Sequence, residues 1–153
     1  MKLQQDLREF IELLNSQQID FIVVGGYAVA YHGYPRFTGD VDFLIRPTLS
    51  NAQRVIAALS SFGFAELTIA PEDLLTENRV IQLGKAPNRI DILTSISGVS
   101  FADAWRGRVA AILDELPVFM LGFKELIANK TAAGRAKDSA DVAQLLLVAK
   151  QNS

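Results

Sequence analysis

Residues 25–42 read GGYAVAYHGYPRFTGDVD, and this stretch places a double glycine shortly before a pair of aspartates. An apolar, β-branched run over 19–24 precedes it and predicts a buried strand that ends at Gly25 and Gly26. A glycine turn at the start of a helix lets backbone N–H groups approach phosphate oxygens, and the helix dipole favours their negative charge. A second strand is predicted over 40–45. The stretch therefore indicates a phosphate-binding turn beside a divalent-metal site, and the alternative interpretation of the double glycine is an ordinary tight turn.

The two aspartates, Asp40 and Asp42, lie two residues apart on the predicted strand, so their side chains point to the same face. The carboxylates repel each other, and a divalent cation between them removes that repulsion. Mg²⁺ or Mn²⁺ suits this arrangement, because hard cations take oxygen ligands from carboxylates and from substrate phosphates. On the alternative, purely structural interpretation, Asp40 caps the loop and Asp42 is an ordinary surface acid.

A third carboxylate, Asp91, lies within the sequence RIDIL over 89–93, which otherwise has the character of a buried strand. Burying a carboxylate between Ile90 and Ile92 is costly unless it is paired or bound to metal. Three acids on adjacent strands can hold two metal ions, and Asp91 would also accept the proton of an attacking hydroxyl. We therefore expect the three carboxylates to converge within about 4–6 Å.

The chain has 153 residues, of which half are hydrophobic, so we expect one compact domain with a substantial core. It has no cysteine, which excludes disulfides and thiolate metal sites. The longest apolar runs are far too short to span a bilayer, and the N-terminal residues are amphipathic and include acids. We therefore expect a cytoplasmic protein that does not bind a membrane.

A formal net charge of −2 and a pI near 5.4 give no general attraction to nucleic acid. A broad nucleic-acid surface is therefore not expected. Basic residues do cluster late in the chain and leave room for a local anion site; they are Arg106, Arg108, Lys124, Lys130, Arg135 and Lys137.

Hydrophobic spacing and turn residues predict a mixed fold, α/β or α+β, in which helices flank a mixed β-sheet. The predicted helices cover 2–16, 27–31, 50–59 with Ser50 as cap, 101–106, 122–133 and 139–150, with Gly134 as the break between the last two. The further predicted strands cover 64–68, a hairpin of 79–83 with 89–93, and an edge strand at 118–121. We expect a single domain over 1–153, with a core over about 19–121 and C-terminal helices over about 122–150.

Taken together, the motifs resemble those of the polymerase-β-like nucleotidyltransferase superfamily. The resemblance rests on Gly25-Gly26-Tyr27-Ala28, His32-Gly33, Arg36-x-Thr38-x-Asp40-x-Asp42 and Asp91. The C-terminal stretches KELIANK (124–130) and RAKDSAD (135–141) are similar to the minimal branch that includes the AbiEii/AbiGii toxins. The resemblance covers the chain from Ile19 to about Leu147.

This resemblance implies a nucleotidyltransferase fold and Mg²⁺-dependent transfer of a nucleoside monophosphate from a nucleoside triphosphate, expected to be ATP, to a hydroxyl. The acceptor would be a protein side chain, a tRNA or a small molecule, and a partner protein could supply it. Asp40, Asp42 and Asp91 would be the metal carboxylates, and Gly25 and Gly26 would contact the nucleotide phosphates. Many members have Ser where this chain has Gly26, so a weaker grip on the triphosphate is expected.

Further polar residues are candidates for nucleotide binding, each with a structural alternative. Arg36 would steady the aspartate pair or a phosphate, or be a surface arginine, and Thr38 would hydrogen-bond the substrate or its own loop. Lys130, Arg135 and Lys137 would reach the triphosphate from the C-terminal helices. The alternative for these three is a solvated face on which Lys137, Asp138 and Asp141 form ion pairs at a helix start. His32 is expected to cap the short helix and Trp105 to serve in packing.

Two other functions fit the same residues. In the first alternative, the chain is a non-catalytic nucleotide- or partner-binding component of a toxin–antitoxin or regulatory system. The small size of the chain favours this interpretation. A buried third acid argues against it, because a pure binding module has no use for Asp91. A metal-dependent nuclease is the third interpretation, since clustered carboxylates also serve hydrolysis, but a broad basic surface is missing.

Overall fold

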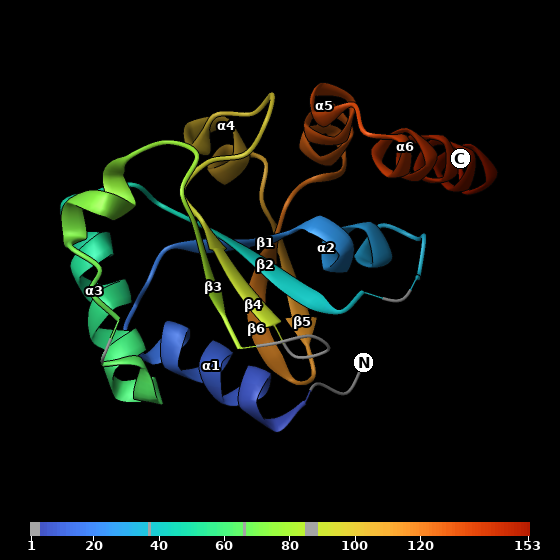
Figure 1. Ribbon diagram of the computed structural model, residues 1–153. Coiled ribbons are helices and arrows are strands. Elements are labelled where there is room, and N and C mark those ends of the chain that lie inside the picture. The colour runs from blue at the N-terminus through green and yellow to red at the C-terminus, as the bar shows by residue number, and fades with distance from the viewer. Residues whose placement is uncertain (1–3, 37, 66, 85–88) are drawn as a thin grey trace.

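The computed structural model describes residues 4–36, 38–65, 67–84 and 89–153, and within them a six-stranded mixed sheet is flanked by helices (Figure 1). The strand order is β3-β4-β2-β1-β6-β5. The strands are β1 (Phe21–Val24), β2 (Asp40–Ile45), β3 (Val80–Leu83), β4 (Arg89–Leu93), β5 (Val109–Leu113) and β6 (Leu116–Met120). The helices are α1 (Gln5–Ser16), α2 (Gly25–Tyr31), α3 (Leu49–Leu59), α4 (Phe101–Arg106), α5 (Phe123–Ala133) and α6 (Ala136–Gln151). The predicted mixed α/β class is confirmed.

Strand pairing combines both directions. β2 is antiparallel to β1 and parallel to β4, while β1 is also parallel to β6. The two edge strands, β3 and β5, each form an antiparallel hairpin with their neighbour in sequence. The predicted hairpin of β3 and β4 is therefore confirmed, and its connection at 85–88 lies outside the described residues.

Apolar residues fill the face of β2 opposite the aspartates, and Leu44, two residues beyond Asp42 on the aspartate face, is buried as well. Val41 and Phe43, which alternate with Asp40 and Asp42, are 2% and 0% exposed. The Phe43 ring lies 5.8 Å from that of Phe10 on α1. Strand alternation thus sends Val41 and Phe43 toward the side that carries α1 and α3, and Asp40 and Asp42 toward the side that carries α2 and α5 (Figure 1).

Glycines set the ends of two helices near the aspartate face. Gly25 has φ +68, a left-handed conformation that favours glycine, where β1 passes directly into α2. Gly134 has φ +67 and ends α5, as predicted from its position between the two C-terminal helices.

The sequence-based assignment was wrong for the edge of the sheet. The strand predicted at 118–121 is β6, and it lies between β1 and β5 because β5, which was not predicted, takes the edge. Asp114 and Glu115 join these two strands with φ values of 48 and 69, the left-handed pair that a tight hairpin requires. Asp-Glu is not one of the glycine-containing pairs that usually mark such a turn, which is why the hairpin gave no signal.

Two smaller assignments also differ. The strand predicted at 64–68 is not formed by the described residues of that range, residue 66 lying outside them; a π-helical turn over Ser60–Phe64 instead extends α3, with Gly63 at φ 103. Helix α3 begins at Leu49 after Thr48, so Ser50 lies inside the helix and is not its cap. Over the described residues, no helix combines the length and apolar character that crossing a bilayer requires.

We predict that Phe10→Ala destabilises the protein by about 3–5 kcal/mol, because the ring is fully buried and contacts Phe43 and Phe62. Ile112→Ala is the control, since Ile112 is 68% exposed on edge strand β5 and its truncation should change stability by less than about 0.5 kcal/mol. The free energy of unfolding in urea checks both values. Equal losses for the two variants would contradict this description of the core.

Candidate active site

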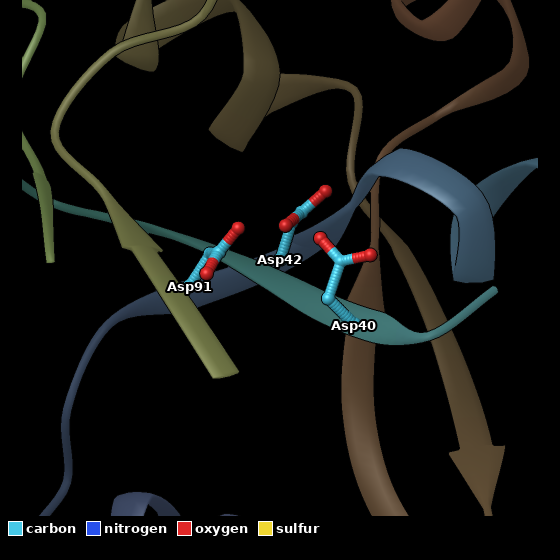
Figure 2. Close-up of side chains that lie close together, drawn as sticks. All are labelled: Asp40, Asp42 and Asp91. Carbon is cyan, nitrogen blue, oxygen red and sulfur yellow. The ribbon is translucent and has the colours of Figure 1, made fainter. Parts of the chain in front are cut away.

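Three carboxylates meet on one face of the sheet. The parallel pairing of β2 with β4 places Asp42 opposite Asp91, and Asp40 precedes Asp42 by two residues on the same face. One ligand oxygen from each of the three lies within 4.8 Å of the others. Figure 2 shows the three side chains rising from β2 and β4 on the same side of the sheet. The expected convergence is confirmed, while the metal-binding and catalytic roles of these residues stay predictions.

Arg89 is a member of this cluster that sequence reasoning missed. Its Nε and one terminal nitrogen donate to the two carboxylate oxygens of Asp91 at 3.0 and 3.1 Å, and the same terminal nitrogen reaches Asp40 at 3.3 Å. Asp91 is only 5% exposed, so this guanidinium supplies the partner that a buried carboxylate needs. The available signal was its spacing, because Arg89 lies two residues before Asp91 on the same strand and therefore on the same face.

The cluster is short of positive charge. Burial raises the pKa of Asp42, and repulsion from Asp40 and then Asp91 raises it further, to about 7. Burial also raises the pKa of Asp91, although its hydrogen bonds from Arg89 act in the opposite direction. A single guanidinium thus leaves the three carboxylates with uncompensated repulsion, and their hard oxygen atoms are of the type that Mg²⁺ and Mn²⁺ bind.

The double glycine is required by the side chains packed against it. A Cβ at Gly25 would lie 2.1 Å from an Oδ atom of Asp42, and a Cβ at Gly26 would lie 2.8 Å from Oγ1 of Thr38. The Thr38 hydroxyl in turn donates to the backbone carbonyl of Asp40 at 3.0 Å. Thr38 therefore holds its own loop, which was one of its two predicted roles, and it occupies the space that any side chain at position 26 would need.

The C-terminal helices contribute a buried network of ion pairs. Lys130 Nζ on α5 lies 3.2 Å from carboxylate oxygens of both Asp138 and Asp141 on α6. Arg135 Nε contacts Asp138 at 2.7 Å, and Arg36 donates to both oxygens of Asp141 at 3.0 and 2.9 Å. These ion pairs join α5, α6 and the loop before β2.

Two sequence-based expectations are corrected by this network. The solvated face proposed for the C-terminal residues is wrong for Lys130, Asp138 and Asp141, which are 5%, 0% and 3% exposed. Arg36 pairs with Asp141 instead of steadying the aspartate pair, so it belongs to the cationic side of the site. Charges separated by a hundred residues were brought together by helix packing, which spacing along the chain does not reveal.

The electrostatics of the network are favourable to its charged form. Burial by itself would raise the pKa of Asp138, but hydrogen bonds from Arg135 and Lys130 lower it to about 2. The pKa of Arg135 is raised, first by its hydrogen bond to Asp138 and also by the charge of Asp42. The cationic network and the carboxylate cluster therefore act on each other across one site.

A pocket of about 500 Å³ joins these parts. Of the residues predicted for the site, the pocket is lined by Gly25, Gly26, Arg36, Thr38, Asp40, Asp42, Lys130, Arg135 and Lys137. Asp91 belongs to the carboxylate cluster but not to the lining. An uncharged part of the lining carries no recognisable motif and was not predicted; it consists of Asn78, Val80, Leu93, Ser95, Ile96, Ser97 and Asn129.

Two other residues of the sequence analysis have structural roles. His32 forms the C-cap of α2, as expected, and its Nε2 lies 2.7 Å from the carbonyl oxygen of Leu121. Trp105 packs against Phe101 and lies beneath the guanidinium of Arg108, 3.9 Å from its ring centre, which confirms its assignment to packing.

Comparison with known proteins identifies a family for this chain. Over residues 1–152 the chain matches a protein family described as a nucleotidyltransferase of unknown function (DUF6036). No curated protein matches the chain. The match spans both the carboxylate cluster and the C-terminal network, and it agrees with the fold expected from the sequence. Its description does not distinguish the polymerase-β-like or AbiEii/AbiGii branch.

We predict that Asp42→Asn changes how stability depends on pH. The pKa of Asp42 is raised in the folded state, so the folded state binds the proton of Asp42 more tightly than the unfolded state does. The stabilisation of the folded state that results is fully present below the ordinary carboxyl pKa of about 4 and is lost as pH rises through 7. In EDTA, the variant should therefore gain stability relative to wild type between about pH 5 and pH 8. Thermal melts across this range measure the effect, with Asp103→Asn, whose side chain is 58% exposed, as control. Parallel curves for wild type and Asp42→Asn would contradict the prediction.

We also predict that Asp138→Asn destabilises the protein by about 3–5 kcal/mol, because it leaves buried Lys130 with a weakened set of partners. The stabilisation from Asp138 is present above a carboxyl pKa of about 4 and is lost as pH falls toward 2. Asp103→Asn again serves as control, since its exposed pair with Arg106 should contribute less than about 1 kcal/mol. Urea unfolding near neutral pH measures both, and similar losses would show that the network is not a stabilising unit.

Proposed function

The chain belongs to the nucleotidyltransferase family that it matches over residues 1–152, and we propose that it transfers a nucleoside monophosphate group from a nucleoside triphosphate to a hydroxyl. The observation that carries this proposal is the convergence of Asp40, Asp42 and Asp91 within 4.8 Å at a pocket whose other side is cationic. A site with both features can hold a triphosphate and act on its α-phosphate.

The finer assignment, to the polymerase-β-like superfamily and its AbiEii/AbiGii-like branch, is part of the proposal. Two features support it. The aspartate pair on β2 has its third acid on the parallel neighbour β4, and the lysine and acidic residues quoted for the branch form the buried network of α5 and α6. Each feature is an arrangement of several residues in space, and such an arrangement is more specific to a family than a short sequence motif.

Asp40, Asp42 and Asp91 would hold Mg²⁺ or Mn²⁺. The fit rests on the donor set, three hard carboxylates within reach of one cation, and on the raised pKa of Asp42, which reports repulsion that a cation would relieve. When bound, the metal supplies positive charge to the reacting phosphate and to the leaving oxygen.

Two groups of residues would bind the phosphates of the nucleotide. The turn at Gly25 and Gly26 offers backbone N–H groups to phosphate oxygens. Four cations and two carboxylates, namely Arg36, Lys130, Arg135, Lys137, Asp138 and Asp141, leave this side of the pocket with a net charge of +2. That charge favours the β- and γ-phosphates, which leave as pyrophosphate.

The covalent step forms a bond between the acceptor oxygen and the α-phosphorus and breaks the bond from that phosphorus to the bridging oxygen of the β-phosphate. Asp91 accepts the proton of the attacking hydroxyl, and Arg89 keeps its carboxylate in place by donating to both oxygens. The proposed acceptor is a hydroxyl of a protein, a tRNA or a small molecule, and the proposed nucleotide is ATP, in the cytoplasm.

Labelled nucleotide tests this function. With Mg²⁺ and a cell extract as the source of acceptors, label from the α-phosphate should enter an acceptor while label from the γ-phosphate should not. Asp91→Asn should lower the α-label transfer by about 10²–10⁴-fold, as expected for loss of a general base. Asp103→Asn, an exposed aspartate outside the pocket, should transfer at the wild-type rate. Circular dichroism confirms that each variant is folded.

Three outcomes would count against the proposal. Transfer of the γ-label would indicate phosphoryl transfer instead. Equal labelling by wild type and Asp91→Asn would remove the role of the carboxylate cluster. Binding of nucleotide without any labelled product, across all four triphosphates, would favour the non-catalytic nucleotide-binding component instead.

A further inference from the structure

The face of β4 that carries Asp91 becomes apolar at Leu93, where the strand enters the lining of the pocket. Leu93 lies two residues beyond Asp91 on the same face of the strand, and Val80 on β3 is its partner in register. Two residues of a strand span about 7 Å, so the apolar floor begins one side-chain position past the carboxylates. Val80 is 52% exposed and Leu93 is partly exposed, although both are apolar. An accessible apolar surface next to a reaction site is a feature of ligand pockets.

Amide and hydroxyl groups surround this apolar floor. The backbone N–H of Asn78 donates to Ser95 Oγ at 2.8 Å, and that hydroxyl lies 3.3 Å from Asn78 Oδ1. Across the pocket, Asn129 Nδ2 on α5 donates to the carbonyl oxygen of Ser97 at 2.9 Å. Each amide is thus held by one defined hydrogen bond and has further donor or acceptor capacity. All of these groups are uncharged.

The parts of the pocket follow the order of the strands. The glycine turn lies at the end of β1, the carboxylates lie on β2 and β4, and the apolar floor lies on β4 and β3, which are neighbours in that sequence. Helix α5 contributes to both the charged and the uncharged part of the pocket. Lys130 contacts Asp138 in the charged part, and the adjacent Asn129 contacts Ser97 in the uncharged part. A nucleoside triphosphate has the same order of parts: charged phosphates, the reacting α-phosphate, then an uncharged base.

We propose that this uncharged end of the pocket binds the nucleobase of the triphosphate. The inference rests on the proposed function, because it assigns a further part of the same pocket. We call this end the base subsite, and its residues are Asn78, Val80, Leu93, Ser95, Ile96 and Asn129. A base is planar, has apolar faces and carries its donors and acceptors in the plane, so an apolar floor with an amide rim matches it. Such a rim also gives the site its means of selecting one base over another.

Binding measurements with two probes test the base subsite. The probes are the four common nucleoside triphosphates and inorganic tripolyphosphate, each with Mg²⁺, titrated calorimetrically into wild type and Val80→Gln. The substitution introduces a neutral polar side chain, so it changes the apolar floor without repelling phosphate. We expect it to raise Kd for the triphosphates by about tenfold, the loss typical of one apolar contact. Kd for tripolyphosphate should change by less than about twofold, because phosphate affinity is set by the cationic side.

Two further variants sharpen the test. Ile112→Gln is the matched control, since Ile112 is also an exposed apolar residue of an edge strand but lies outside the pocket, and it should leave both affinities unchanged. Asn129→Ala should narrow the ratio of affinities among the four triphosphates by about tenfold, because it removes one hydrogen-bonding group from the rim.

The outcomes separate this inference from the proposed function. If wild type binds neither probe, the proposed function fails and the base subsite with it. If wild type binds tripolyphosphate as tightly as every nucleoside triphosphate, the phosphate site stands and the base subsite is wrong. An unchanged triphosphate Kd in Val80→Gln also overturns it, and loss of transfer in that variant would then assign this end to the acceptor. Equal weakening of both probes overturns it as well.

Discussion

Three carboxylates that repel one another are accommodated on a single face of the sheet. The parallel pairing of β2 with β4 leaves Asp42 opposite Asp91, and the period of two along β2 adds Asp40 to the same face. Arg89, placed on that face by the same period, relieves part of the repulsion by pairing with Asp91 and Asp40. The remainder is expressed in the raised pKa of Asp42. A fold tolerates such a cluster when a cation completes it, which is the physical basis for the metal site that we propose.

The opposite wall of the pocket has an excess of positive charge. Here cations outnumber carboxylates, and two aspartates of α6 are buried to hold Lys130, Arg135 and Arg36 in fixed positions. The ion pairs that join α5 and α6 therefore also hold these cations at the pocket. The acidic and cationic walls line one pocket, and the charge of Asp42 contributes to raising the pKa of Arg135. A triphosphate that carries a divalent cation would complement both walls, because the cation offsets the carboxylates and the phosphates offset the cationic side chains.

Steric fit links the glycine turn to the loop before β2. Gly25 leaves room for the Asp42 carboxylate and Gly26 leaves room for Thr38, so the turn and the acidic strand could not approach as they do with larger residues. The departure from the Gly-Ser pattern at position 26 thus has a local cause, since the Thr38 side chain already fills that space. Motif residues that look independent in the sequence are coupled by contact.

The mixed fold, the strand that carries Asp40 and Asp42, and Asp91 as a candidate third acid were predictable from the order of the residues, because strand periodicity and the burial cost of a carboxylate are local properties. The sequence also indicated the glycine turn and the break at Gly134. It did not reveal β5, whose turn residues lack the usual hairpin signal, and it did not reveal the role of Arg89. Nor did it show that Arg36 pairs with Asp141 or that Asn129 stands beside Ser97. These facts were decided by the tertiary structure, because a contact between residues far apart in the chain depends on how helices and strands pack, and packing leaves no regular period in the sequence to read.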